Sequence, residues 1–305
     1  MKNILFVVNP KAGNGIEDGF IDRLKKHCEN EGVDYEIYVT TGKNDTRQIE
    51  TLLNENNFEV IFSAGGDGTF TLIAELVKDR SIKVGIIPIG TSNGLASDLG
   101  IDSDPFAAFQ NLLNSNHILH LDQIVINDKE TIYHIGDIGA NANLIKRYES
   151  SDESSYAAYA KHVFEELRAE QAFAYEIETP EGNFSGSARM IAICNARRFG
   201  TKVALSQKSH PADGLFELIV FREIDIKTII ESGLSSIWDG FDKLMNNEKQ
   251  VIQTHSATVR VSPKTLYQLD GEVQGDTGEL KIQIHKGVID LLCQGNCPYL
   301  ENGSF

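Results

Sequence analysis

Hydrophobic runs alternate with amphipathic stretches through the first 120 residues of the chain. Four apolar runs of strand length are found at residues 4–8, 35–40, 60–64 and 84–88. The stretches between them carry apolar residues at helical spacing, as Phe70, Ile73 and Val77 do. Strands that alternate with helices in this way predict a parallel sheet with helices on both faces. We therefore predict a doubly wound α/β domain over residues 1–122.

The pattern changes near residue 123, where strand-like runs follow one another with few helices between them. We expect eight strands, at residues 123–126, 132–138, 173–178, 189–195, 215–221, 257–262, 266–269 and 280–285. Helical spacing is expected at residues 156–168 and 226–235. Consecutive strands of this kind predict an antiparallel sandwich or barrel, and we expect the sandwich. The predicted fold class is thus α/β, with a β-sandwich domain over residues 123–288.

Charge and hydropathy restrict the classes of partner. The chain has 305 residues, and 28 Lys and Arg against 44 Asp and Glu give it a net charge of −16. This balance excludes the broad basic surface that non-specific nucleic-acid binding needs. No apolar run approaches the roughly 20 residues of a membrane span, and the N-terminal apolar segment is too short for a signal peptide. We expect a cytoplasmic protein.

The four cysteines are Cys28, Cys194, Cys293 and Cys297. The last two form a C-x3-C pair without a nearby histidine, which is a weak zinc signature. Reduced thiols of a cytoplasmic protein are the favoured interpretation.

The strongest chemical signal is the motif Gly65-Gly66-Asp67-Gly68-Thr69, which follows a predicted strand and precedes a predicted helix. Glycines let the backbone turn tightly and approach a ligand closely. The free amides at the start of the helix form an anion site. Thr69 can cap the helix or donate its hydroxyl to a phosphate, and Asp67 is expected to orient the loop or to act through a cation. A plain strand-to-helix turn would not require three glycines.

Further loops follow the other predicted parallel strands. One begins at Asn9, and another covers residues 90–96 and includes Thr91 and Asn93. Thr40 ends the second strand. Loops at the carboxyl ends of parallel strands line the ligand crevice of an open sheet. These residues are therefore candidates for the same binding site.

The second half contains the sequence Asp270-Gly271-Glu272 at a predicted strand end. One interpretation is a structural Asp-Gly turn. The other is a catalytic carboxylate that accepts the proton of a hydroxyl nucleophile.

The strand–GGDGT–helix arrangement resembles the nucleotide loop of diacylglycerol kinases, sphingosine kinases, NAD kinases and, more distantly, phosphofructokinases. Neither a Walker A motif nor a Rossmann fingerprint occurs. The resemblance implies ATP as phosphate donor and Mg²⁺ as cofactor. It also implies that residues 289–305 return to the first domain. The nucleotide-binding residues that it implies are Asn9, Thr40, Gly65, Gly66, Asp67, Gly68, Thr69, Thr91 and Asn93.

In the second domain, the resemblance implies Asp270 as catalytic base with Glu272 in support, because the lipid kinases place their proposed catalytic Asp in a D-G-E sequence. It also implies a structural magnesium held by Asp213 and the main-chain oxygen of Leu215. Glu217 stands where the family has Asp, and His210 could contribute only its carbonyl oxygen.

Other positions depart from the diacylglycerol kinase pattern: Gly94 replaces an Asp, Leu95 a Phe, and Ala140 and Asn141 an aromatic residue and an acid. The acceptor therefore stays open between a diacylglycerol and a sphingoid base. NAD kinase and a non-catalytic nucleotide-binding regulator are the alternatives. We expect a neutral lipid-like acceptor, transient membrane contact by a protein that is otherwise cytoplasmic, and no fixed oligomeric state, with a homodimer allowed.

Overall fold

The computed structural model describes residues 3–13, 15–90, 93–139, 172–199, 203–204, 209–222 and 249–300. The helices predicted at residues 156–168 and 226–235 lie outside these ranges. The chain divides into two compact units. Unit 1 comprises Met1–Asp122 and Lys286–Phe305, and unit 2 comprises Gln123–His285.

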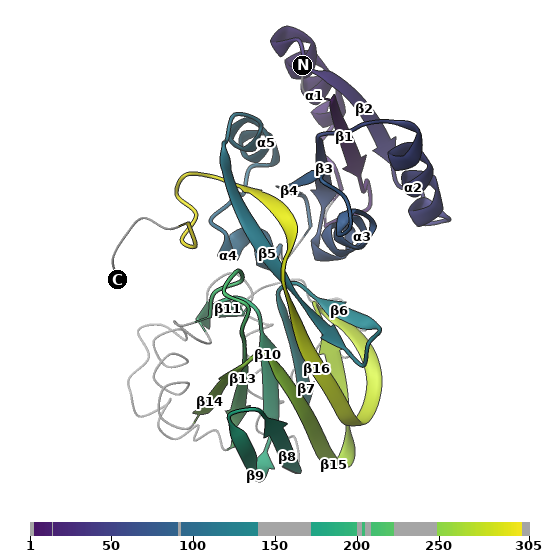
Figure 1. Cartoon of the computed structure of the whole chain (residues 1–305). Coiled ribbons are helices and arrows are strands. Elements are labelled where there is room, and N and C mark those ends of the chain that lie inside the picture. The colour runs from purple at the N-terminus through teal and green to yellow at the C-terminus, as the bar shows by residue number, and fades with distance from the viewer. Residues whose placement is uncertain are drawn as a thin grey trace, which may run out of the picture. The chain divides into compact units, whose positions relative to one another are not determined.

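Unit 1 is built on a parallel sheet, visible in the purple and blue part of the ribbon in Figure 1. The strand order is β4-β3-β1-β2. These strands are β1 (Asn3–Val8), β2 (Asp34–Val39), β3 (Val60–Gly65) and β4 (Lys83–Pro88). The carboxyl-terminal end of β16 (Glu272–Cys293) joins parallel to β4, with Leu291 opposite Val84. The inner strands are buried along almost their whole length, as expected of a sheet with helices on both faces.

The helices of unit 1 are α1 (Phe20–Glu31), α2 (Asp45–Glu55), α3 (Asp67–Val77), α4 (Gly94–Asp98) and α5 (Pro105–Leu113). On one face, α1 and α5 pack against alternate residues of β1 and β3. The ring of Phe109 meets those of Phe6 and Phe62 edge-on, with centroids 5.4 and 5.3 Å away. Helices α2 and α3 contact each other and add no buried residue to this cluster, as expected of helices on the opposite face.

Unit 2 is almost entirely strands. Its elements are β6 (Glu130–Ile132), β7 (Ile135–Gly139), β8 (Phe173–Thr179), β9 (Gly182–Ala188), β10 (Met190–Cys194), the short pair β11 (Arg198–Phe199) and β12 (Val203–Ala204), β13 (Phe216–Phe221), β14 (Lys249–Thr254) and β15 (Ser256–Leu269). The order β14-β13-β10-β7-β15 is antiparallel throughout. Both β5 (His117–Ile126) and β16 have residues in unit 1 and unit 2.

Strand β15 passes from one layer of unit 2 to the other. Its first half pairs with β8, where Thr258 lies opposite Glu178, and its end pairs with β7, where Tyr267 lies opposite Ile138. Its register with β16 shifts between Arg260 and Thr265. Strands that change sheets at such irregularities form the corners of sandwiches. A single apolar cluster drawn from β5 to β10 and β13 to β16 fills the core, and the predicted fold class, α/β followed by a β-sandwich, is confirmed.

All four cysteines are buried and none forms a disulfide. Among the helices that the structure describes, none has both the length and the apolar character required to cross a membrane.

Candidate active site

The GGDGT motif lies where β3 ends and α3 begins, and space requires a glycine at Gly65 and at Gly90, a residue that lies next to the motif. A Cβ on Gly65 would lie 2.3 Å from Oγ1 of Thr69. A Cβ on Gly90, in the loop after β4, would lie 2.7 Å from Cα of Gly66. Both distances are too short for any side chain, so the loops after β3 and β4 touch backbone to backbone. The result is a side-chain-free surface at the start of α3.

Asp67 joins two helices of unit 1. Its Oδ2 accepts a hydrogen bond from the amide of Gly94 at 3.0 Å, and its Oδ1 accepts one from the amide of Leu95 at 3.4 Å. A carboxylate is favoured there because the first amides of a helix have no partner within the helix. Asp67 therefore orients the loop, one of the two roles predicted for it.

The remaining loop residues of unit 1 lie at the carboxyl ends of neighbouring strands. Nδ2 of Asn9 donates to Oγ1 of Thr69 at 3.3 Å, which connects the ends of β1 and β3. The amide of Thr40 donates to the carbonyl of Val8 at 2.8 Å. Asn93 adopts a left-handed conformation (φ 43°), and its Nδ2 donates to the carbonyl of Gly90 at 2.5 Å. Thr91 lies outside the described residues.

Asp45 has a role in this site that we did not predict. Its carboxylate accepts from the amides of Thr41 (2.9 Å) and Gly42 (2.7 Å) and from the hydroxyl of Tyr38 (2.7 Å). It thereby fixes the loop that follows Thr40. Burial by itself would raise the pKa of Asp45, but these hydrogen bonds outweigh it and lower the pKa. The sequence signal that could have indicated this role is the segment Gly42-Lys43-Asn44-Asp45, in which turn-forming residues directly precede a helix.

Asp270 and Gly271 form the two-residue turn between β15 and β16. Their φ angles are 45° and 90°, and Leu269 pairs with Glu272 across the turn. Two positive φ angles are typical of a type I′ hairpin, for which Asp-Gly is a preferred sequence. Glu272 is exposed. The structural interpretation of this sequence is therefore correct, and it does not exclude a catalytic one.

The carboxylate of Asp270 is held by three backbone amides of the segment between β6 and β7. Oδ2 accepts from Tyr133 at 2.9 Å, and Oδ1 accepts from His134 and Ile135 at 3.1 and 3.0 Å. Donors of this kind stabilise the ionised form of a carboxylate. The side chain of Asn195 donates to the carbonyl of Tyr133 at 2.9 Å and so supports the same segment. Three backbone amides therefore fix the position of the Asp270 carboxylate.

The predicted magnesium segment forms a tight turn before β13. Oδ1 of Asp213 accepts from the amide of Leu215 at 2.8 Å. The carbonyl of His210 accepts from the amides of Ala212 and Asp213 at 2.8 and 3.3 Å. No group of three or more His, Cys, Asp or Glu side chains suited to a metal occurs in the described part of the chain. The carbonyl of His210 and the carboxylate of Asp213 are therefore already engaged locally.

Glu217, two residues beyond Leu215, is only 1% exposed. Its Oε1 accepts from Nε2 of Gln253 at 2.9 Å, while its Oε2 has no hydrogen-bond partner among the described residues. Burial raises the pKa of Glu217 to about 7, and the nearby negative charge of Asp213 contributes. The nearby Ser209 hydroxyl and the side-chain amide of Gln253 act in the opposite direction and lower this pKa. A buried carboxylate beside Asp213 is a candidate ligand for a hard cation.

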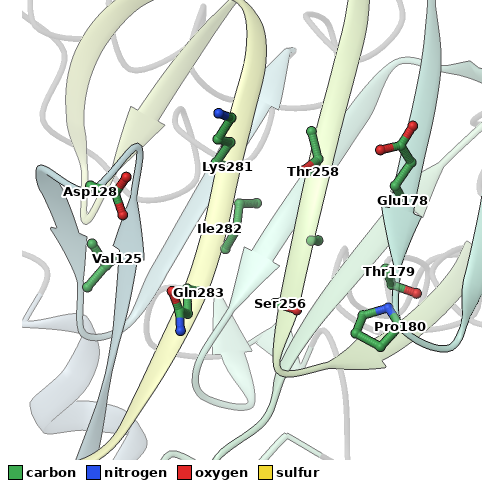
Figure 2. Close-up of a pocket in the computed structure, with 11 residues that line it drawn as sticks. Val125, Asp128, Glu178, Thr179, Pro180, Ser256, Thr258, Lys281, Ile282 and Gln283 are labelled. Atoms are coloured by element: carbon green, nitrogen blue, oxygen red, sulfur yellow. The ribbon is translucent and has the colours of Figure 1, made fainter.

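A shallow cavity of about 340 Å³ lies on unit 2, away from these groups. Figure 2 shows its wall formed by side chains of β5, β8, β15 and β16, with Lys281, Thr258 and Glu178 in a row across three strands. Asp270 and Asp213 do not line it. Asp128 and Lys281 bring charges of opposite sign to this cavity, and the carboxylate of Glu178 pairs with Arg260 at 2.6 Å.

Comparison with known proteins gives the family. Residues 3–124 match the diacylglycerol kinase catalytic domain, and residues 137–293 match the YegS C-terminal NAD kinase beta sandwich-like domain. The chain therefore belongs to the family of lipid kinases that combines these two domains, and the family resemblance read from its motifs is confirmed.

Individual relatives are distant but cover nearly the whole chain. A probable lipid kinase YegS-like from Yersinia enterocolitica is 25% identical, over 98% of this chain and 100% of the relative. A diacylglycerol kinase from Bacillus subtilis is 23% identical, over 90% and 91%. The crystal structure of a diacylglycerol kinase from Bacillus anthracis matches with a TM-score of 0.71 at 18% identity, covering 97% of this chain and 98% of that one. This last likeness supports the fold.

Proposed function

We propose that this protein transfers the γ-phosphoryl group of ATP to the hydroxyl of a neutral lipid, such as a diacylglycerol or a sphingoid base. The observation that carries the proposal is the glycine surface of unit 1, in which Asp67 links the start of α3 to the start of α4. In the reaction, the acceptor oxygen forms a bond to the γ-phosphorus as the bond to the β–γ bridging oxygen breaks. The products are a lipid phosphate, ADP and a proton.

The phosphate groups would contact the surface around Gly65, Gly66 and Gly68. A Cβ on Gly65 or Gly90 would intrude on a neighbour, so the backbone there has no side chains and can approach a ligand closely. Asn9, Thr69 and Thr40 would bind nucleotide from the ends of β1 to β3. The carboxylate of Asp67 is bonded to the amides of Gly94 and Leu95, so in this proposal it positions the loop and does not itself contact phosphate.

Asp270 would receive or orient the proton of the acceptor hydroxyl. Its three amide donors hold the carboxylate in one position. Phosphoryl transfer depends mainly on positioning and charge stabilisation, so a carboxylate that is fixed in place suits this reaction. Glu272 is exposed and would contribute charge beside Asp270.

Asp213, Glu217 and the main-chain oxygen of Leu215 would hold a structural Mg²⁺. Oε2 of Glu217 fits this role because it is buried without a partner among the described residues. A second Mg²⁺, bound with ATP, would neutralise charge on the phosphates.

The acidic protein would meet its lipid by transient contact from the cytoplasm, since its charge does not favour tight adhesion to anionic membranes. Its oligomeric state stays open, with a homodimer allowed, and is measurable by sedimentation.

The test is a transfer assay with [γ-³²P]ATP and Mg²⁺, with diacylglycerol, sphingosine or NAD as acceptor, the lipids in mixed micelles. We expect labelled lipid phosphate from the parent and a loss of roughly 10²–10⁴-fold in turnover for Asp270→Asn, the range of general-base catalysis. The exposed residue Asp276 gives a matched control, Asp276→Asn, which should retain parental turnover.

The NAD arm of the assay separates the lipid kinase from its nearest alternative. Labelled NADP without labelled lipid would replace our proposal with NAD kinase activity. ATP binding without transfer to any acceptor, together with no effect of Asp270→Asn on slow ATP hydrolysis, would indicate a nucleotide-binding regulator.

A further inference from the structure

Two buried polar side chains of unit 2 are linked by hydrogen bonds to the backbone of the turn that contains Asp270. Gln268, 1% exposed, lies on β15 opposite Asp137 of β7, which is fully buried. Nε2 of Gln268 donates to Oδ2 of Asp137, and Oε1 of Gln268 accepts from the amide of Gly271 at 2.7 Å. A hydrogen-bonded chain thus runs from Asp137 through Gln268 to the backbone of the turn.

The order of donors in this chain is determined at its Gly271 end. A backbone amide can only donate, so the side-chain oxygen of Gln268 faces Gly271. The NH₂ group of Gln268 is then the end that faces Asp137, and Oδ2 of Asp137 accepts from it. Because both side chains are buried, the opposite orientation would leave unpaired polar atoms. Asp137 therefore supplies the acceptor that Gln268 requires in the orientation that holds Gly271.

The turn requires such support because its backbone is unusual. Asp270 is a non-glycine residue in the left-handed region, with φ 45°, a conformation that surrounding contacts have to maintain. Its own amide donates to the carbonyl of Ile135 at 3.0 Å. A change in the turn would move the Asp270 carboxylate relative to the amides of Tyr133 to Ile135. The Gln268 bond to Gly271 is a further contact that holds the turn, at the residue after Asp270.

We propose that Asp137 and Gln268 are positioning residues for the lipid kinase reaction, which set the place of the Asp270 carboxylate through the backbone of Gly271. The inference rests on the proposed function for its catalytic consequence. Neither residue contacts substrate in this account, so their loss should reduce kcat and leave the KM for ATP unchanged. Misplacement of a catalytic group by about 1 Å can cost on the order of 10²-fold in rate.

The experiment compares Gln268→Leu, Asp137→Leu and the conservative variant Asp137→Asn. The matched control is Gln283→Leu, at an exposed position of β16. Two quantities are measured: kcat and KM for ATP in the transfer assay, and amide hydrogen exchange by NMR at Gly271 and at Tyr133 to Ile135. Gln268→Leu and Asp137→Leu should lower kcat by about 10- to 100-fold and speed exchange at those amides. Asp137→Asn should stay within a few-fold of the parent, because its Oδ1 can accept the same bond from Gln268. Gln283→Leu should change neither quantity.

Parental kcat and parental exchange at Gly271 in a folded Gln268→Leu variant would overturn the inference, even if Asp270→Asn were inactive and the proposed function held. If the parent transferred phosphate to no acceptor, the proposed function would fail by itself, and the exchange rates alone would decide whether Asp137 and Gln268 hold the turn. Should Gln268→Leu not fold, Gln268→Met, of similar length but without the amide, takes its place. An equal loss of kcat in Asp137→Asn and Asp137→Leu would also count against the inference, because the hydrogen bond would then not be the cause.

Discussion

The carboxylate of Asp67 lies 3.0 Å from the amide nitrogen of Gly94, and this bond joins the first turn of α3 to the first turn of α4. These two helices follow neighbouring parallel strands, β3 and β4. The carboxylate of Asp67 also accepts from the amide of Leu95 at 3.4 Å, so one side chain connects the carboxyl ends of the two strands through the helices that follow them.

This relationship predicts that Asp67→Asn weakens nucleotide binding. The Asn side chain could accept from one amide only, and its NH₂ group would face the other. Hydrogen bonds to charged groups contribute about 1.5–3 kcal/mol, so we expect the affinity for ATP to fall about tenfold or more. Calorimetric titration with ATP and Mg²⁺ measures it, and Asp79→Asn, at an exposed position of unit 1, is the control. Equal affinities of the two variants would refute the role given to Asp67.

Gly66 and Gly90 should respond differently to the same substitution. A Cβ on Gly66 would lie at an ordinary 3.5 Å from Cα of Gly90, whereas a Cβ on Gly90 would lie only 2.7 Å from Cα of Gly66. Gly66→Ala should therefore retain the melting temperature of the parent and still bind ATP more weakly, because its methyl group lies on the phosphate surface. Gly90→Ala should melt several degrees lower. A Gly66→Ala protein with unchanged ATP affinity would place the phosphates elsewhere.

The pKa of Asp45 predicts a dependence of stability on acid. Its folded-state pKa lies below the ordinary value of 3.8, so the unfolded chain binds the proton more readily. The stabilisation is complete above that ordinary value and is lost as the pH falls through the lower folded-state pKa. Asp45→Asn should thus lower the melting temperature by a few degrees at pH 7, and the difference from the parent should shrink as the pH falls below about 4. Asp34→Asn, at an exposed position of β2, should show no such convergence.

The sequence predicted unit 1 well because each of its elements has a regular apolar period and a loop with its own chemistry. Residues 60–64 and the motif after them agree with β3 and the start of α3. Helix α5 was not predicted, although Asp104 caps it by accepting from the amide of Ala107 at 2.7 Å and Pro105 begins it. Four apolar residues of α5 are buried against the rest of unit 1. Such long-range packing cannot be inferred from the sequence of a nine-residue segment by itself.

Unit 2 was harder to predict because its strands depend on long-range pairing. Strands expected at 257–262 and 266–269 are one strand, β15, which bends where its register shifts. Strand β9 was missed, since Gly182–Ala188 contains Gly, Asn and Ser and pairs only with β8. The partners of Asp270 are 135 to 137 residues away in the sequence, so no local pattern could indicate them.

The last prediction concerns the cation. Asp213 and Glu217 lie four residues apart around a tight turn, and Glu217 has a buried oxygen without a partner among the described residues. If Mg²⁺ binds there in the folded protein only, it stabilises by an amount that grows with concentration, about 2.7 kcal/mol at 100 times Kd. Asp213→Asn should therefore erase the rise in melting temperature that Mg²⁺ gives the parent. Glu217→Gln should do the same while keeping the fold, because the amide oxygen can still accept from Gln253. Asp276→Asn, an exposed control in unit 2, should show the full rise. A rise of equal size in the parent, Asp213→Asn and Glu217→Gln would mean that Mg²⁺ binds at another place, and the turn before β13 would then be held by the Asp213 bond to Leu215 alone.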